Sequence, residues 1–339
     1  MNVILNNIAG TFLIDARAAF LNGAGLGSGE DRNKVIPKTF RERVNGRLEE
    51  VPYVSAQAWR RWLRNTTNEE NNWSPSELES IGKSDKGSTS KISTKLNPIS
   101  YPEDDLFGYM RSGSGSEESV QRTSPFKNSI LKGIPGMRVL NNDEAFVHLK
   151  EGTPLPYSTR FYSTHLEGFF NLEYYRLGVY DNLGSHVELA KEFLDEYNEK
   201  LQEDSIYGKF KRYTLNNPES SRKTRAAGLL KGLVHLRGGA KQAAFGSDVA
   251  PKAIILAGME CANPVFNDLF DGSGEKPSLK ISTLLEIVED YKTKLATKVY
   301  IGIRAGYLAN EEEVKKLDEN FVVTSPVEAV NNFTQAHLK

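Results

Sequence analysis

Apolar and polar residues alternate with two different periods along the chain, and these periods predict its secondary structure. Residues 3–16 alternate as in a β-strand, and residues 250–258 form a nearly continuous apolar run that is typical of a buried strand. Residues 55–65 and 221–236 follow the helical period instead, with apolar side chains returning every three or four positions. We therefore expect strands and helices to share the core.

Other segments extend this pattern. The Asn45–Gly46 pair lies between two strand-like flanks and predicts a β-hairpin. Further strands are expected within residues 121–134, 160–180 and 298–308, and further helices within residues 185–203 and 279–295. Because these elements are too few for a doubly wound parallel sheet, we expect an α+β fold in which a sheet packs against helices.

Three stretches differ in composition from the rest of the chain. Residues 66–100 are polar and rich in Ser, Thr and Asn, which predicts an inserted, partly mobile subdomain. Residues 111–119 are rich in Gly and Ser and predict a flexible loop. Residues 133–160 hold several Gly and Pro, which is typical of an extended excursion rather than of a core.

The helix predicted at residues 55–65 has an apolar stripe and a capping residue. Ala56, Trp59 and Leu63 fall on one side at helical spacing, so this side is expected to dock on the sheet. Ser55 is a suitable N-cap, because its hydroxyl can accept a free backbone N–H of the first turn.

A second, polar stripe lies about a quarter of a turn away on the same helix. It consists of Gln57, Arg61 and Arg64, with Arg60 between the two stripes. Two interpretations remain open. The stripe is either the solvated basic face of an ordinary amphipathic helix, or a group of guanidinium side chains that a docked helix offers to an anion.

The charge is unevenly distributed, although the net charge is only −1. Residues 32–64 hold nine Lys or Arg against three Glu, whereas residues 188–204 hold seven acids against two Lys. A protein with separate basic and acidic regions can bind a polyanion on one face and remain in solution through another. The acidic region can also meet the basic region of a second copy, which favours an assembly over a lone nucleic-acid binder.

The composition excludes several classes of protein. A chain of 339 residues with 39% hydrophobic and 26% charged residues is an ordinary globular chain that can bury a large core. Its single cysteine, Cys261, excludes an internal disulfide and a cysteine-based zinc site. The sequence shows neither a transmembrane run nor the basic start of a secretory signal, so we expect a cytoplasmic protein with no membrane partner.

No catalytic or metal-binding motif stands out. The five histidines are scattered without metal-ligand spacing, and neither a Walker A nor a G-x-S-x-G motif is present. The glycine-rich residues 22–31 miss the dinucleotide-binding spacing. Asp104 and Asp105 lie in a polar context and are expected to be solvated. The sequence therefore offers no convincing catalytic constellation, and we expect no metal or cofactor.

An adjacent pair of glycines, Gly238 and Gly239, lies beside Arg237 and Lys241. Glycines let a backbone approach a phosphate closely, and the two cations would flank it. The alternative is a plain turn between a helix and a strand.

Six motifs occur in a fixed order: GTFLIDARAAFLNGAG, PYVSAQAWRRWLR, DDLFGYM, RTSPFKNS, FYSTHLEGFFNL and GGAKQAAFGSDVAPKAIILA. Together they resemble the DevR-type backbone subunit of CRISPR type I Cascade, the seventh Cas protein family, and most of all its type I-B branch. The resemblance spans roughly residues 8–258. Its most specific parts are the S-x-Q-x-x-[KR]-R-x-x-R pattern and the GG-x-x-Q-x-x-F block in combination.

This resemblance implies a ferredoxin-like, RNA-recognition-type palm with an inserted fingers subdomain and an extended thumb. The composition of the chain sets the limits of the fingers and the thumb. Together, resemblance and composition place palm segments at residues 1–65, 121–128 and 165–339, the last with surface helices, the fingers at 66–120 and the thumb at 129–164.

The resemblance also implies a function. The subunit would be non-catalytic, polymerise along the CRISPR guide RNA, grip its phosphate backbone and present its bases to complementary target DNA. Further copies of the chain would lie side by side, next to a large subunit and the subunits that bind the RNA handle. The resulting ribonucleoprotein complex would serve antiviral defence in the cytoplasm.

The residues expected to contact RNA combine basic side chains with the small or polar residues beside them. Guanidinium groups suit phosphate because they donate two parallel hydrogen bonds. The expected set is Arg17, Lys38, Arg41, Arg43, Ser55, Gln57, Arg60, Arg61, Arg64, Arg122, Lys127, Arg237, Gly238, Gly239, Lys241 and Gln242. In the thumb, Ile134, Met137 and Leu140 would act as apolar wedges between bases.

Two other functions remain open. Related backbone subunits of type III effectors cleave target RNA with a loop aspartate, and Asp31 is the candidate in this chain. The DevR name suggests a regulator that binds duplex DNA, although no helix-turn-helix signature is visible.

Overall fold

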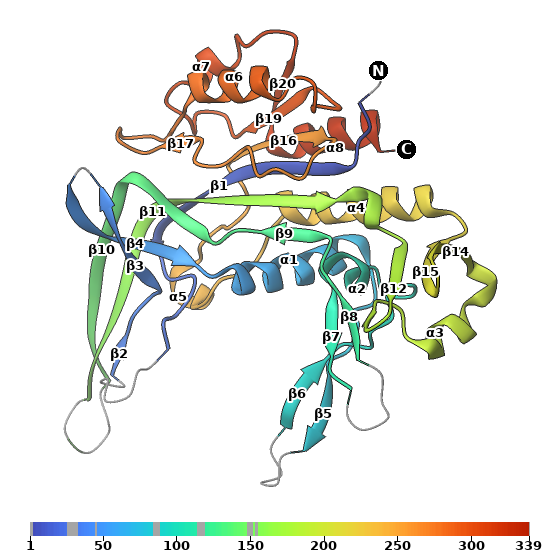
Figure 1. The fold of residues 1–339 in the computed structure, drawn as a ribbon. Coiled ribbons are helices and arrows are strands. Elements are labelled where there is room, and N and C mark those ends of the chain that lie inside the picture. Colours follow the sequence, from blue (N-terminus) through green and yellow to red (C-terminus); the bar gives the residue numbers. More distant parts are fainter. Residues whose placement is uncertain are drawn as a thin grey trace.

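A ten-stranded sheet forms the centre of the protein (Figure 1). The computed structural model of the chain describes residues 3–25, 33–44, 46–83, 89–113, 119–147, 152 and 155–338. The strands of this sheet are β1 (Asn7–Ala19), β2 (Lys34–Val35), β3 (Thr39–Val44), β4 (Arg47–Val54), β9 (Phe126–Asn128), β10 (Leu131–Val147), β11 (Leu155–Glu173), β16 (Ala253–Met259), β19 (Val299–Ile303) and β20 (Phe321–Thr324). Along the main path the order is β20-β19-β16-β1-β11-β10-β4-β3, and β2 and β9 pair with β11 beside it.

The middle of this sheet is antiparallel. β1 pairs with β11 on one side and with β16 on the other, and β9 pairs with the end of β11. Two helices connect these strands, because α1 (Ala56–Asn71) comes before β9 and α4 (Pro218–Val234) comes before β16. Strands and helices therefore share the core, and the expected α+β class is confirmed.

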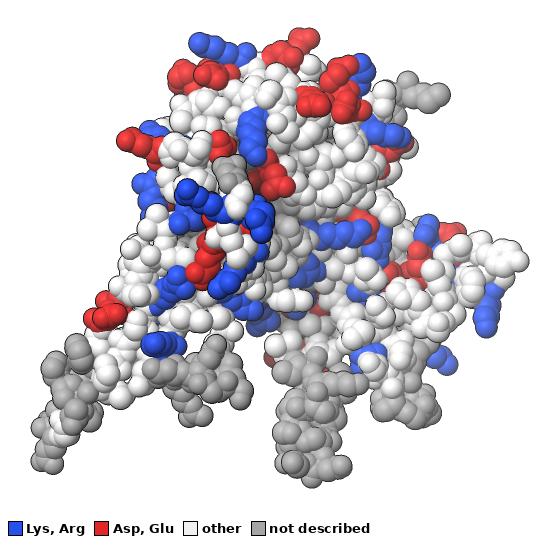
Figure 2. Space-filling view, turned by 60° about the vertical axis from the view of Figure 1, so that its left-hand side comes forward, with Lys and Arg blue, Asp and Glu red and all other residues white. Residues whose placement is uncertain are grey.

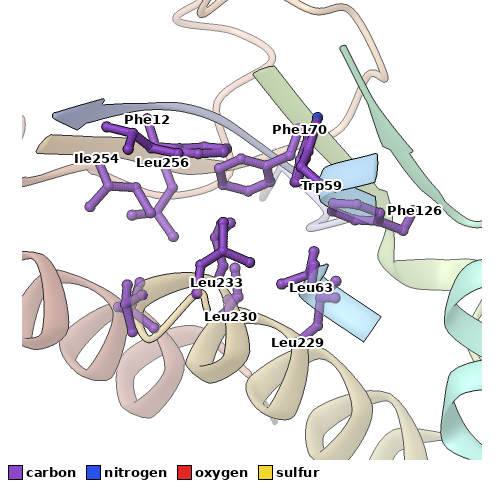
Figure 3. Close-up of a cluster of buried hydrophobic side chains, with 14 of the residues drawn as sticks. Phe12, Trp59, Leu63, Phe126, Phe170, Leu229, Leu230, Leu233, Ile254 and Leu256 are labelled. Carbon is purple, nitrogen blue, oxygen red and sulfur yellow. The ribbon is translucent and has the colours of Figure 1, made fainter. Parts of the chain in front are cut away.

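Three helices cover one face of the sheet and form the main core with it (Figure 3). They are α1, α4 and α8 (Pro326–His337). Trp59 and Leu63 from α1 meet Leu230 from α4 and Phe12 from β1 in this core, as the apolar stripe of the sequence predicts. No helix within the described residues is long and apolar enough to span a membrane.

The segment 260–317 covers the opposite face of the sheet. Its elements are β17 (Phe270–Asp271), β18 (Ser278–Leu279), α6 (Ile281–Asp290) and α7 (Glu311–Val314). Apolar side chains of this segment pack on β16 and β19 in a second core cluster. Because both faces are covered, β16 is buried along its whole length, which explains its continuous apolar sequence.

A second, six-stranded sheet has the order β14-β15-β12-β13-β8-β7. Its strands are β7 (Tyr109–Arg111), β8 (Val120–Arg122), β12 (Val179–Leu183), β13 (His186–Val187), β14 (Leu201–Tyr207) and β15 (Phe210–Leu215). Shorter elements surround it: α2 (Pro102–Phe107), η1 (Tyr174–Arg176), α3 (Lys191–Glu196), η2 (Asn198–Lys200) and the hairpin of β5 (Glu79–Lys83) and β6 (Thr89–Ser93).

The second sheet combines strands from two parts of the chain. It pairs β8 with β13, so residues 179–215 share a sheet with residues 109–122, although the expected limits place them in the segment 165–339. The helix expected within residues 185–203 is also shorter than predicted, because β14 already begins at Leu201.

A buried ion network connects the second sheet to α4. Asp105 in α2 is fully buried, and its carboxylate accepts hydrogen bonds from Arg122 in β8 and Arg225 in α4. Glu188 accepts a hydrogen bond from Arg122 Nη1 at 2.8 Å. Asp104 is also buried, and its burial raises its pKa. The expectation that Asp104 and Asp105 are solvated is therefore wrong, because the arginines compensate the buried charge of Asp105.

β10 and β11 form a long hairpin that projects from the same side of the molecule as the β5–β6 hairpin (Figure 1). Its pairing is continuous from Arg138 opposite Thr164 to Val147 opposite Leu155. Pro135 and Gly136 lie at the one irregularity in this pairing, between Gly133 and Arg138. In its described residues, the excursion expected at residues 133–160 is thus a hairpin with regular pairing beyond Arg138.

Candidate nucleic-acid interface

Hydrogen bonds attach the start of α1 to the chain that follows β1. Ser55 is the N-cap of α1, and its Oγ accepts the Ala58 N–H at 3.4 Å, as the sequence predicts. Asn22 Oδ1 accepts the Ser55 N–H at 3.0 Å. The Ser55 hydroxyl is therefore used inside the helix cap. Asn22 is a positioning residue that the sequence reasoning missed, although its place before Gly23 is a turn signal.

Gln57 and Arg61 are the exposed members of the polar stripe on α1. Among the described residues, neither side chain has a hydrogen bond or an ion pair with another group of the protein. The first turn of α1 also contains no acidic residue. The positive end of the helix dipole is thus not neutralised, and it would favour an anion near Gln57 in the first turn. Arg61, one turn further along, adds the charge of its guanidinium.

Arg60, in contrast, points into the protein. Its guanidinium donates hydrogen bonds to the carbonyl oxygens of Phe126 and Phe107 and to Asn128 Oδ1, at 2.7 to 2.9 Å. Burial, with the neighbouring charge of Arg64, lowers the pKa of Arg60 to about 10. These bonds occupy the group, so we correct the expectation that Arg60 contacts RNA and assign it to packing.

Two further arginines are also removed from the expected contacts. Arg64 lies over the ring of Phe107, and its side chain is only 16% exposed beside Glu103. Burial lowers the pKa of Arg64. Arg122 is fully buried in the ion network with Asp105. Arg122 therefore has no free face for a phosphate, and Arg64 is mostly covered by its neighbours.

The glycine pair lies against α1 and the end of β1. A Cβ at Gly238 would be 2.3 Å from the Trp62 ring, and one at Gly239, which has φ 107°, would be 2.7 Å from the Leu21 side chain. The Ala240 N–H donates to Leu21 O at 2.9 Å. The glycines are therefore explained by a tight turn. This turn holds the loop 237–242 beside the middle of α1, where Arg237 N–H donates to Thr66 Oγ1.

Three expected basic contacts are exposed or partly exposed but already have acidic partners. The pairs are Arg237 with Glu69 and Glu70, Lys127 with Glu173, and Arg17 with Asp15. A phosphate would have to compete with these carboxylates, so we expect less binding energy from them than from Arg61.

Two lysines lie on segments that are bonded to the strands beside α1 or to the residues that follow β1. Lys241 Nζ donates to Thr159 Oγ1 on β11 at 2.9 Å. The Lys38 N–H donates to Asn22 O at 2.8 Å. The segments that carry Lys38 and Lys241, and the start of α1, are thus all bonded to residues 21 and 22 after β1. We name the set of Lys38, Gln57, Arg61 and Lys241 on these segments the α1 junction.

Lys and Arg side chains gather on the side of the molecule that carries β3 and β10 (Figure 2). Arg41 and Arg43 are exposed on β3, as expected for residues that meet an anion.

Gln242 lies within the glycine loop and donates its side-chain N–H to Gly238 O. Its role in the structure is therefore to close that loop.

The expected wedge residues have different surroundings in the structure. Ile134 is only 2% exposed and belongs to the second core cluster, so we correct its assignment as a wedge. Leu140 packs against the main core, and Met137 is half-buried. Among the side chains of the hairpin that the structure describes, the exposed large apolar ones are Val139, Leu155 and Tyr157.

Within the described ranges, no three His, Cys, Asp or Glu side chains gather in a way that could hold a metal ion. Asp31, the candidate of the endonuclease alternative, lies outside the described residues.

Known proteins resemble this chain in sequence and in fold. The model of the family "CRISPR-associated negative auto-regulator DevR/Csa2" matches residues 8–276. Two solved structures, named "CRISPR RNA-guided surveillance complex" and "CRISPR RNA-guided surveillance complex, pre-nicking", are similar in fold with TM-scores of 0.52 and 0.55. Each alignment covers 97% of this chain and 99% of the other at 12% identity. No curated protein matched. Since the family match spans most of the sequence, the chain belongs to the CRISPR-associated DevR/Csa2 family.

Proposed function

We propose that this chain is a non-catalytic backbone subunit of a CRISPR type I effector complex, and that it holds the phosphate backbone of the guide RNA. Copies would lie side by side along one guide, next to the other subunits of the complex, and leave its bases free to pair with target DNA. The observation that carries this proposal is the α1 junction of a DevR/Csa2 family member, where Arg61 is exposed in the second turn of a helix that has no acid in its first turn.

The chemistry of the α1 junction suits a phosphate backbone better than a base. Arg61 can donate two parallel hydrogen bonds to one phosphate, and Lys38 and Lys241 add charge on the neighbouring segments. Such contacts position a strand without reading its sequence. This fits a guide-directed complex, in which base pairing carries the specificity.

The topology supports an assignment of the subdomains. We assign the antiparallel strands β16-β1-β11-β9 with α1 and α4 to a ferredoxin-like palm, because α1 and α4 follow the first and third strands of this βαββαβ order. The β10–β11 hairpin would be the thumb. The six-stranded sheet and the β5–β6 hairpin would be the fingers.

The proposal is tested by removing one charge. Arg61→Ala is expected to weaken binding of single-stranded RNA by about tenfold, the equivalent of one charge-assisted hydrogen bond. It should also reduce the dependence of the affinity on salt, because one fewer counterion is released. Lys292→Ala is the matched control, since Lys292 is an exposed cation that follows α6 on the opposite face. Equal affinities and salt slopes for the two folded variants would contradict the proposal.

The same preparation separates the alternatives. We expect that complementary RNA is not cleaved in Mg²⁺, and that Asp31→Ala changes nothing. Cleavage that disappears in this variant would favour the endonuclease. Because the family description includes an auto-regulator, duplex DNA serves as competitor, and tighter binding of the duplex than of single-stranded RNA would favour a regulator.

A further inference from the structure

Three phenylalanines form an aromatic cluster beside the α1 junction. Phe20 follows β1, Phe161 lies in β11, and Phe245 ends the short helix α5 (Gln242–Phe245). The rings of Phe20 and Phe245 are stacked, with centroids 6.5 Å apart and planes at 21°. The Phe161 and Phe245 centroids are 5.6 Å apart. The three rings are thus in contact, although they come from distant parts of the sequence.

The rings of this cluster differ in exposure. Phe20 is only 2% exposed and forms its buried base. Phe161 and Phe245 are half-buried, and both neighbours of Phe245 in the sequence, Ala244 and Gly246, are exposed. The cluster therefore presents part of two aromatic rings at the surface, supported by a third ring from below.

Hydrogen bonds and charge connect this cluster to the α1 junction. Lys241 Nζ lies 5.4 Å from the Phe20 centroid and donates to Thr159, two residues before Phe161 on the same strand. The loop that carries Phe245 is bonded to the end of β1 through Ala240. An RNA phosphate held by the α1 junction would therefore have its nucleotide near these rings.

We propose that Phe161 and Phe245 form a stacking platform for one nucleobase of the bound RNA, next to the phosphate that Lys241 neutralises. Aromatic rings beside a cation are the combination by which proteins hold single strands, and the stacking tolerates every sequence because each base has a π-face. A platform of this kind would fix the spacing of bases along a guide without selecting among them. This inference rests on the proposed function, since it needs an RNA strand at the α1 junction.

The test uses the full-length chain and single-stranded RNA that carries 2-aminopurine at one position at a time. Phe245→Leu keeps an apolar side chain of similar size but removes the ring. It is expected to weaken binding about tenfold, the typical loss of one stacked base. It should also abolish the change in 2-aminopurine fluorescence that the wild type produces. Tyr207→Ala is the control, because Tyr207 is a 79% exposed aromatic residue on β14.

The next RNA carries an abasic nucleotide at the position where 2-aminopurine fluorescence changes. It should bind the wild type as weakly as intact RNA binds the Phe245→Leu variant. Combining the abasic RNA with this variant should weaken binding little further. Equal affinity of Phe245→Leu and the wild type would overturn the platform. The platform would also be overturned if Phe245→Leu bound short RNA normally but impaired self-association of the chain without RNA. The rings would then contact a second copy instead of a base. If Arg61→Ala weakens binding and Phe245→Leu does not, this inference fails while the proposed function stands. If the wild type binds no RNA at all, the proposed function itself fails.

Discussion

Replacing Asp105 by Asn removes a negative charge that two buried arginines share. Its two carboxylate oxygens accept hydrogen bonds from Arg122 and Arg225. After the substitution, Arg122 would keep Glu188 as an acidic partner at 2.8 Å, whereas Arg225 would keep only uncharged acceptors such as the Tyr180 hydroxyl at 3.3 Å. Asn has nearly the same volume as Asp, so the effect is electrostatic rather than steric.

The magnitude follows from the burial of this network. Asp105 is 0% exposed and Arg225 is 5% exposed, so solvent cannot replace the lost charge. Breaking a buried pair by removing one partner costs about 3–5 kcal/mol. Asn retains one oxygen that accepts a hydrogen bond, which places the expected loss in the free energy of unfolding near the lower end, at about 3 kcal/mol. This is a large part of the roughly 5–15 kcal/mol that stabilises a typical domain.

The assay is urea-induced unfolding followed by circular dichroism. Asp181→Asn serves as control, because Asp181 forms a similar pair with Arg212 at 2.7 Å but on the surface, where the two side chains are 27% and 46% exposed. Exposed pairs contribute about 0–1 kcal/mol. If both substitutions lower the free energy of unfolding by the same small amount, the reasoning that this network attaches the second sheet to α4 is refuted.

Three further stability predictions use the same assay. Burial raises the pKa of Glu167 to about 7 from its ordinary 4.5, so the folded protein holds a proton that the unfolded chain releases. Stability should therefore fall by about 3 kcal/mol as the pH rises from about 4.5 to 7, and Glu167→Gln should flatten this dependence. Gly239→Val should lower the free energy of unfolding by about 1–3 kcal/mol, because position 239 has φ 107° and the valine Cβ would crowd Leu21. An unchanged melting temperature would contradict this prediction. Arg60→Ala should lower the free energy of unfolding by about 1–3 kcal/mol, because buried carbonyl groups lose their donor. Arg61→Ala should change it by no more than about 0.5 kcal/mol, and the reverse order would refute the assignment of the two side chains.

The local features of the fold could be predicted from the sequence, because they depend on neighbouring residues. The Ser55 cap, the buried Trp59 and Leu63, the hairpin at Gly46 and the buried strand β16 all occur where their patterns indicate. Periodicity also separated the apolar stripe of α1 from its polar stripe, but α1 continues to Asn71, beyond the predicted end.

The features that sequence reasoning missed depend on contacts between distant residues. Arg60 and Arg61 are adjacent and identical in type, yet Arg60 meets the carbonyl of Phe126 while Arg61 faces solvent. A helical wheel shows which side chains share a face of α1, but it does not show which distant segments pack against that face. In the same way, Asp105 looks solvated in its acidic surroundings until Arg225, 120 positions further along the chain, is placed beside it.

In the proposed assembly, several copies of this chain hold one guide RNA through their α1 junctions. Native mass spectrometry of the chain, co-expressed with guide RNAs of three different spacer lengths, tests this arrangement. The number of bound copies should rise in proportion to spacer length, with a constant number of nucleotides per copy. Arg61→Ala should lower this occupancy, whereas Lys292→Ala should not. A copy number that is independent of guide length, or chains that purify without RNA, would contradict this arrangement.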